Sequence, residues 1–254
     1  MFETRLAVAS TPDLHVVPPP HPFVIEPTDD VQTHYQKGDR FDFNLILFGT
    51  VNRQIPYFIY AFERMGEIGI GRAINGGRGL FELEKVKCSN RILYLAKEGR
   101  LRTISPCREL TLKETGPPDE KVKRLALSFH TPLRIKFNGR LSRDLPFHVL
   151  VRAMLRRASS LLGCYGAGEP DIDYRGLVQR AHHVETESNR LSWRDWRRYS
   201  KRQQQSMMMG GLVGSIIYRG DLAEFLPLVD FCSKVHIGKQ TAFGLGKFHG
   251  EPGT

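Results

Sequence analysis

The chain has 254 residues, a formal net charge of +10 at pH 7 and a pI of about 9.6. This length accommodates two domains of about 100 residues each, and the excess positive charge favours a polyanionic partner such as nucleic acid. The sequence contains no apolar run of about 18 residues that could span a membrane, and its first residues resemble neither a signal peptide nor a transit sequence. We therefore expect a cytoplasmic protein without a membrane partner.

The cysteines show no pattern of a metal site or a disulfide framework. They stand far apart along the chain, whereas a zinc site usually contains a closely spaced pair. We expect reduced thiols, no metal and no other cofactor; the residues are Cys88, Cys107, Cys164 and Cys232.

The first half of the chain begins with a proline-rich stretch. Residues 1–30 contain six prolines, which exclude a long helix there. A run of glycine, proline and acidic residues at 115–120 is the best linker candidate, so we place the domains at 1–115 and 121–254. The apolar patterns predict, in order, a short strand at 23–25, a strand at 41–48, a helix at 52–66, a strand from Phe81 to Glu84 and a hairpin at 92–95 and 100–104.

The second half carries six predicted elements. An amphipathic helix at 145–163 is expected to be capped by Asp144 and to end at Gly163. A loop is expected to follow, to about residue 190. The other elements are strands at 125–132, 191–199 and 212–218, a helix at 221–234 and a strand at 241–248. The resulting order, βαββαβ, is the ferredoxin-like arrangement.

The fold class that we predict is α+β, with tandem ferredoxin-like (RRM-like) modules. The first module is incomplete, because no sequence is left for its opening strand and helix. Two explanations stay open. Either the module lacks these elements by nature, or the polypeptide starts downstream of the beginning of the full protein, which we favour.

A glycine-rich loop occurs twice in the chain. Ile70, Gly71 and Arg72 are followed, after four residues, by Gly-x-Gly-x-Phe, and a closely similar run starts at Ile237. Each copy follows a predicted strand and helix, so a whole structural unit is repeated. Glycines let the backbone approach a ligand closely, and exposed N–H groups can cradle phosphate oxygens while lysines supply charge.

The alternative for this loop is a tight connection that serves packing alone. We favour contact with nucleic acid, because a basic residue holds the same position in both copies. The predicted RNA-binding residues are Gly238, Lys239, Gly244, Gly246, Lys247 and, in the first copy, Arg72.

Residues 190–202 alternate cations with aromatic side chains. Cations neutralise phosphates and aromatic rings stack on bases, which is typical of proteins that bind single-stranded RNA. The alternative is a solvated basic strand, and we expect one of Trp193 and Trp196 to face the core. The cations from which we expect RNA contact are Arg194, Arg197, Arg198 and Arg202.

One face of the predicted helix at 145–163 carries His148, Arg152, Arg156 and Arg157. Such a stripe can follow a phosphate backbone or can simply be solvated, and the sequence favours neither. Arg152 and Arg156 are therefore further RNA-binding candidates.

Cleavage of an RNA strand by its own 2′-OH requires a base, an acid for the leaving 5′-oxygen, and cations around the phosphorus. Histidine suits the first two roles near neutral pH. His236, directly before the glycine loop, is the first catalytic candidate, and His148 is the second; His182 and His183 follow. Each of them, taken singly, also has a structural or solvent-exposed interpretation.

The stretch from His236 to Lys239, with Gly244-Leu245-Gly246, closely resembles the C-terminal signature of the CRISPR-associated RAMP endoribonucleases that process precursor crRNA. The resemblance extends over essentially all of residues 2–249. Other similar segments are Pro22 to Pro27, Leu47 to Gly49 with Pro56 to Ile59, Gly69 to Arg72, and Trp193 with Tyr199 to Gln203.

This resemblance implies tandem ferredoxin-like modules, binding of CRISPR repeat RNA, and metal-independent cleavage that leaves a 2′,3′-cyclic phosphate. It also implies precursor crRNA, and other CRISPR effector subunits, as partners. Members of the family carry a further strand and helix before the segment that Phe2-Glu3-Thr4 resembles, often with the catalytic histidine on that helix. No residue here occupies that position, so RNA binding is a firmer expectation than cleavage.

Two other functions stay open. A noncatalytic RNA-binding subunit of a CRISPR ribonucleoprotein would use the same loops without chemistry. A nucleotide-binding regulatory module is a weaker alternative.

Overall fold

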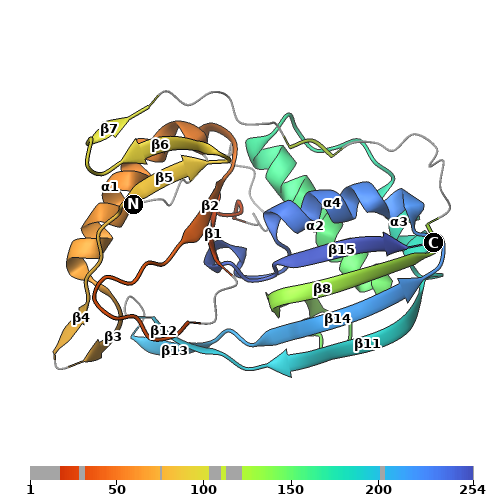
Figure 1. The fold of residues 1–254 in the computed structure, drawn as a ribbon. Helices are drawn as coiled ribbons and strands as arrows, with labels where there is room; N and C mark the ends of the chain where they lie inside the picture. The colour runs from red at the N-terminus through yellow and green to blue at the C-terminus, as the bar shows by residue number, and fades with distance from the viewer. Residues whose placement is uncertain are drawn as a thin grey trace, which may run out of the picture.

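Figure 1 shows the computed structural model, which describes residues 18–28, 32–74, 76–102, 110–112, 122–200 and 204–253. Its C-terminal part is built on a four-stranded antiparallel sheet of order β11-β14-β8-β15. The first strand in sequence lies between the third and the fourth, as in the split βαβ arrangement, so the predicted ferredoxin-like module is confirmed. The strands are β8 (Arg124–Leu133), β11 (Glu185–Arg194), β14 (Gly211–Arg219) and β15 (Phe248–Gly253).

Helices α2 (Phe147–Tyr165) and α4 (Leu226–Val235) cover one face of this sheet (Figure 1). The alternation of β8 sends Leu125, Leu127 and Phe129 into the core on that side, and each is almost fully buried. Burying an aliphatic side chain contributes about 1.5–3 kcal/mol, so these residues hold the helices to the sheet.

The intervening residues of β8, among them Ser128 and His130, are exposed on the opposite side. We call this side of the sheet the open face.

The register of the sheet defines its two ends. At one end, β8 finishes at Leu133 opposite the start of β14, and we call it the loop end. At the other, Arg124 pairs with Arg219, and we call it the far end. A strand of this length spans about 30 Å, so residues at the two ends cannot share a site.

The N-terminal part contains small sheets and one long helix. β1 and β2 form an antiparallel pair, β3 and β4 a hairpin, and β5, β6 and β7 a three-stranded sheet. The elements are β1 (Phe23–Pro27), β2 (Phe43–Leu47), the 3-10 turn η1 (Gly49–Gln54), α1 (Ile55–Ile68), β3 (Ile70–Ile74), β4 (Gly77–Gly79), β5 (Lys85–Cys88), β6 (Arg91–Leu95) and β7 (Arg100–Leu101). The strands expected at 23–25 and 41–48, the helix and the hairpin are confirmed, apart from Thr103 and Ile104, which lie outside the described residues.

The strand expected from Phe81 to Glu84 is wrong. The backbone N–H of Phe81 donates to the carbonyl of Gly66 at 3.2 Å, and a Cβ on Gly66 would lie 2.1 Å from the Phe81 carbonyl oxygen. This segment therefore packs against the last turns of α1 instead of pairing with a strand. The predicted linker at 115–120 lies outside the described residues.

Two expectations about helix ends are also wrong. The N-cap of α2 is Pro146, without a side-chain capping bond, so Asp144 does not cap the helix. Gly163 lies inside α2, which ends at Tyr165.

The loop expected before residue 190 contains α3 (Tyr174–Ala181), whose first turn is capped by Asp173 through a 2.8 Å bond from the Gly176 N–H. β11 therefore starts at Glu185, earlier than expected, and the basic segment continues after it as the hairpin of β12 (Arg197–Ser200) and β13 (Gln205–Met208).

The final strand was expected at 241–248 but runs from Phe248 to Gly253. Residues 241–243 form the 3-10 turn η3 (Thr241–Phe243) instead. Gln240 before the turn and Gly244 after it both have left-handed backbones, which interrupt the extended conformation of a strand.

Candidate nucleic-acid interface

The second glycine-rich loop, residues 236–247, lies at the loop end between α4 and β15. Its backbone is bonded to the end of β8: the N–H of Lys239 donates to the carbonyl of Arg134 at 2.8 Å, and that of Gly246 donates to the carbonyl of Pro132 at 3.2 Å. The loop is therefore a fixed part of the C-terminal fold.

The glycines of this loop serve packing. Gly238, Gly244 and Gly246 have positive φ, and Gly244 and Gly246 are buried. An added Cβ would lie 2.6 Å from the Arg134 carbonyl oxygen at Gly238, 2.7 Å from that of Ile25 at Gly244 and 1.8 Å from that of Ile237 at Gly246. The space beside these glycines is occupied by protein backbone, which favours the packing interpretation over close approach to a phosphate.

His236, the first catalytic candidate, is completely buried. Its Nε2 lies 2.8 Å from a carboxylate oxygen of Glu26 on β1, and its Nδ1 lies 3.2 Å from the carbonyl oxygen of Leu245. Both partners carry acceptor oxygens, so the two ring nitrogens are each engaged inside the protein. A ring engaged on both sides inside the protein is not available to RNA.

Glu26 joins the N-terminal part of the chain to this loop. Its carboxylate also accepts a 3.0 Å bond from the Asn44 amide and lies 3.3 Å from the ammonium of Lys247. Burial raises the pKa of Glu26, but the bonds from His236 and Asn44 and the charge of Lys247 outweigh it and hold that pKa below the ordinary value. Lys247 therefore points into this cluster, which we call the Glu26 cluster.

Arg157 was expected on the exposed face of its helix but is only 8% exposed. Its guanidinium donates to the carbonyls of Val235 and His236, at 2.8 and 3.1 Å, and lies over the ring of Phe48. Burial lowers its pKa to about 10. A cation that caps the C-terminus of α4 fixes the point where the glycine loop begins.

The exposed side of the loop meets the β12–β13 hairpin. The guanidinium of Arg198 lies 4.1 Å from the ring centroid of Phe243, which is 42% exposed. Exposed cationic and aromatic side chains stand nearby in sequence, as expected for RNA contact, together with the acidic Asp195. We call the following set the loop–hairpin surface: Arg194, Trp196, Arg197, Arg198, Tyr199, Lys239 and Phe243.

The remaining predicted cations lie elsewhere. Arg152 and Arg156 are exposed on α2, and Arg72 is exposed on β3. Arg202 lies outside the described residues. Trp193 is partly buried against the core while Trp196 is 47% exposed, so the expectation that one of the two tryptophans faces the core is confirmed.

His148, the second catalytic candidate, lies near the far end of the sheet. Its helix begins there, since Phe147 packs on Tyr218 near the end of β14. The ring of His148 stacks on that of His182, with centroids 3.8 Å apart and an interplanar angle of 16°. Burial, His182 and Arg152 lower the pKa of His148. The structure thus brings two candidate histidines together, but not beside the glycine loop.

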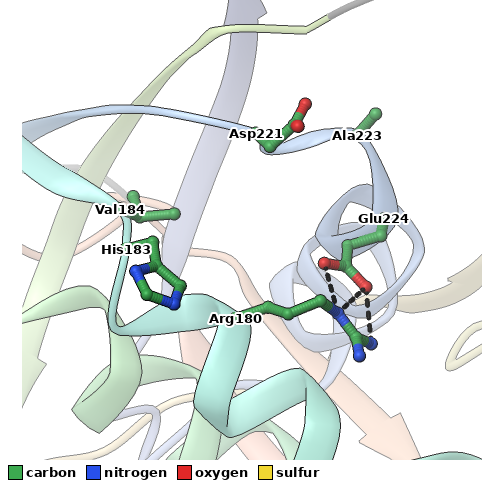
Figure 2. A pocket seen from close by; sticks show the side chains of 6 residues that line it. All are labelled: Arg180, His183, Val184, Asp221, Ala223 and Glu224. Atoms are coloured by element: carbon green, nitrogen blue, oxygen red, sulfur yellow. Dashed lines mark hydrogen bonds and ion pairs between the residues drawn. The ribbon is translucent and has the colours of Figure 1, made fainter.

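A cavity of about 350 Å³ also lies at the far end. Figure 2 shows the Arg180 guanidinium paired with Glu224 across it, at 2.8 Å. Asp173 binds the same guanidinium at 3.3 Å. The charge of Arg180 is thus balanced by carboxylates, so we place the nucleic-acid interface at the loop end. The lining residues are Arg180, His183, Val184, Asp221, Ala223 and Glu224.

Within the described ranges, no group of three or more histidines, cysteines and carboxylates comes together as a metal site. Cys88, Cys164 and Cys232 are reduced thiols, while Cys107 lies outside the described residues. None of the helices in the described parts of the chain has the length and apolarity needed to cross a bilayer.

The sequence interpretation missed Glu26 and the role of Phe243. Glu26 contacts a residue 210 positions away, and no local pattern indicates such a contact. The exposure of Phe243 could have been predicted, because a large aromatic residue within a glycine-rich loop has little hydrophobic core to pack into.

Comparisons with known proteins agree with this architecture. The family of CRISPR-associated endoribonuclease Cas6 matches residues 127–248, and a family described as an N-terminal domain matches residues 1–106. Among solved structures, the chain is similar to Thermus thermophilus Cas6 in a product complex, with 18% identity and a TM-score of 0.54, over 94% of this chain and 84% of that one.

It is also similar to a chain of a Cas6-RT-Cas1–Cas2 complex, with 15% identity and a TM-score of 0.57, over 91% of this chain and 24% of that one. At these identities the structural likeness shows the fold. No curated protein matches the chain.

Replacing Gly246 by alanine tests the packing role of the loop glycines. Gly246→Ala combines a φ of +75° with a Cβ that would lie 1.8 Å from a backbone oxygen, whereas Gly139 has a φ of +80° and open space. We expect Gly139→Ala to lower the free energy of unfolding by about 1–2 kcal/mol and Gly246→Ala by at least about 2 kcal/mol more. Urea unfolding of both variants measures the two decreases in the free energy of unfolding. Equal decreases would contradict the packing role of Gly246.

Replacing Glu26 by glutamine tests the Glu26 cluster. A carboxylate whose pKa is depressed on folding stabilises the protein above its unfolded pKa, and that contribution disappears as the pH falls through the folded pKa. We expect Glu26→Gln to cost about 1–3 kcal/mol at pH 7 and the difference from the wild type to shrink as the pH falls below the ordinary glutamate pKa of 4.5. Denaturant titrations from pH 3 to 7 measure it, with the exposed Glu82→Gln as a control; a destabilisation independent of pH would refute the role of the charge.

Proposed function

We propose that the chain is a CRISPR-associated endoribonuclease of the Cas6 family, whose model matches residues 127–248 and whose members process CRISPR RNA. In this proposal it binds CRISPR repeat RNA at the loop–hairpin surface and cleaves precursor crRNA. Such processing implies a cytoplasmic protein that meets the CRISPR transcript there. Other CRISPR effector subunits are the protein partners that this function implies.

The contact of Arg198 with Phe243 carries this proposal. It unites the two sequence motifs, the glycine loop and the basic aromatic segment, in one exposed surface. A cation stacked on an aromatic ring keeps its charge available to a phosphate while its plane offers a platform to a base. Lys239, Arg194 and Arg197 supply further positive charge around it.

The chemistry that we propose is attack by the RNA 2′-oxygen on the adjacent phosphorus. A base takes the 2′-OH proton, the bond from phosphorus to the 5′-oxygen breaks, and an acid protonates that oxygen. The products are a 2′,3′-cyclic phosphate and a 5′-OH. Since water does not add and no electrons leave, imidazole and guanidinium groups can carry all proton and charge movements, and the reaction needs no metal.

We infer that His236 positions the loop and does not touch RNA, since both its ring nitrogens are bonded inside the protein. His148 is too distant from a phosphodiester held at the loop–hairpin surface, because its stack with His182 lies toward the other end of a sheet that spans about 30 Å. A noncatalytic RNA-binding subunit is therefore the second candidate function, favoured by the burial of the best-placed histidine.

Removing charge from the loop–hairpin surface tests RNA binding. The variant Arg197→Ala/Arg198→Ala/Lys239→Ala should bind the cognate repeat RNA more weakly, with a salt dependence flatter by about 0.7 in slope for each phosphate that is no longer neutralised. Fluorescence anisotropy over a range of salt concentrations measures both. Lys85→Ala/Lys97→Ala, two exposed lysines of the N-terminal part, is the control, and an unchanged slope in the triple variant would remove this surface from RNA binding.

Cleavage in excess EDTA tests the reaction class. End-labelled repeat RNA should be cut at one position, and the 5′ fragment should carry a cyclic phosphate that acid opens. Binding is read from the same samples. Binding without cleavage would select the noncatalytic RNA-binding subunit, and absence of both would reject the proposed function.

A further inference from the structure

Two exposed histidines lie beside the glycine loop on the open face of the sheet. His130 stands near the end of β8 and His249 near the start of β15. Both are exposed, His249 with 65% of its side chain. Neither stood out in the sequence, where His130 is one polar position of an alternating strand.

The strand register fixes how these histidines lie. Phe129 pairs with Phe248, and Ser128 pairs with His249. The backbone N–H of His130 donates to the carbonyl of Lys247 at 3.0 Å, so the register continues past His130. His130 and His249 are therefore diagonal neighbours across two strands, with Cα atoms about 7–8 Å apart.

Both histidines face the same side. Phe129 and Phe248 are each 3% exposed and pack on each other in the core, with ring centroids 5.6 Å apart. Because side chains alternate along a strand, the residue that follows each phenylalanine points to the open face.

This pair is tied to the glycine loop through the next residue of β8. The hydroxyl of Thr131 donates to the carbonyl of Gly244 at 2.8 Å and accepts from the N–H of Lys247 at 2.8 Å. The position of His130 relative to the loop is thus set by two hydrogen bonds one residue away.

We propose that His130 and His249 are the acid–base pair that cleaves the RNA strand; this inference rests on the proposed function. One imidazole takes the proton of the 2′-OH, the 2′-oxygen bonds to phosphorus, the bond to the 5′-oxygen breaks, and the other imidazolium gives that oxygen its proton. The exchange leaves the two histidines with opposite protonation states, which bulk water restores.

The spacing suits this reaction. In an in-line displacement the attacking and leaving oxygens lie on opposite sides of phosphorus, so acid and base must approach from two directions, each within hydrogen-bond reach of about 2.6–3.2 Å. Diagonal neighbours on one face of a sheet leave room for a phosphate between their imidazoles. The stacked rings of His148 and His182, 3.8 Å apart, leave none.

The surroundings provide polar and charged groups. Ser128 beside His249 pairs with Ser215, and Ser215 pairs with Arg190, so one row across the sheet carries two hydroxyls and a guanidinium. Arg190 is exposed and can bind a flanking phosphate. Glu251 lies 3.6 Å from Nε2 of His249 with both side chains in solvent, and therefore restrains that ring weakly.

Single-turnover cleavage of cognate repeat RNA in EDTA tests the pair. His130→Ala and His249→Ala should each slow cleavage by about 100- to 10,000-fold, while the dissociation constant changes less than about threefold. The exposed His34→Ala is the matched control and should cleave at the wild-type rate. Both target side chains are exposed, so thermal melting should show folded variants.

A substrate with sulfur in place of the bridging 5′-oxygen separates the two roles. Its leaving group needs no proton, so it should restore cleavage to the variant that lacks the acid and not to the variant that lacks the base. Restoration of one variant alone supports the assignment. Rates within about threefold of the wild type in both variants would overturn it while the proposed function stands.

Binding by the wild type without cleavage would overturn both this pair and the cleavage half of the proposed function, and would leave RNA binding intact. If the two variants bound RNA more weakly but kept the wild-type single-turnover rate, the histidines would be RNA-binding residues. That outcome would also overturn their catalytic assignment.

Discussion

The bond between Glu26 and His236 is the contact on which the arrangement of the glycine loop depends. It joins a strand near the start of the chain to a loop near its end, 210 positions apart. Burying an ion pair costs desolvation, which good geometry and further hydrogen bonds must offset. Here Asn44 and Lys247 also contact the carboxylate of Glu26, and the carbonyl oxygen of Leu245 lies within hydrogen-bond distance of Nδ1 of His236. Since the cluster is complete only when β1 lies against the loop, it couples the position of the N-terminal strands to the shape of the glycine loop.

Arg157 and the glycines fix the same loop from the other side. The guanidinium caps α4 where the loop begins and packs on Phe48, so one side chain contacts both parts of the chain. Gly246 leaves just enough room for the backbone of Ile237. A loop held this way loses little conformational entropy when a ligand binds its outer side chains. Lys239 and Phe243, which are exposed, are presented by a rigid support, so a loop whose glycines serve packing can still belong to the proposed RNA-binding surface.

The sequence predicted the sheet far better than the site. Alternation of Leu125, Leu127 and Phe129 identifies a strand because burial on one face is a local, periodic property. The spacing of apolar residues located α2 for the same reason. Glu26, by contrast, looks like any polar residue of a half-buried strand, and Arg157 looks like part of a basic stripe, because their partners are distant in sequence. His236 was singled out for its place beside a motif, and a motif gives no information on which way a side chain points. The strand expected from Phe81 to Glu84 failed through a similar long-range effect, the close packing on Gly66.

The exposure of His130 and His249 follows from the same alternation that builds the core. In β8 and β15 the register that stacks Phe129 on Phe248 also sends His130 and His249 to the open face. A shift of one residue in either strand would exchange the two sets, placing imidazoles in the core and aromatic rings in solvent. The hydrophobic core therefore sets the position of the exposed histidines without touching them. Thr131, bonded to the glycine loop from the next position of β8, links this pair to the proposed RNA-binding surface. The proposed reactive site needs no dedicated scaffold, because the interactions that fold the sheet also hold the two histidines in place.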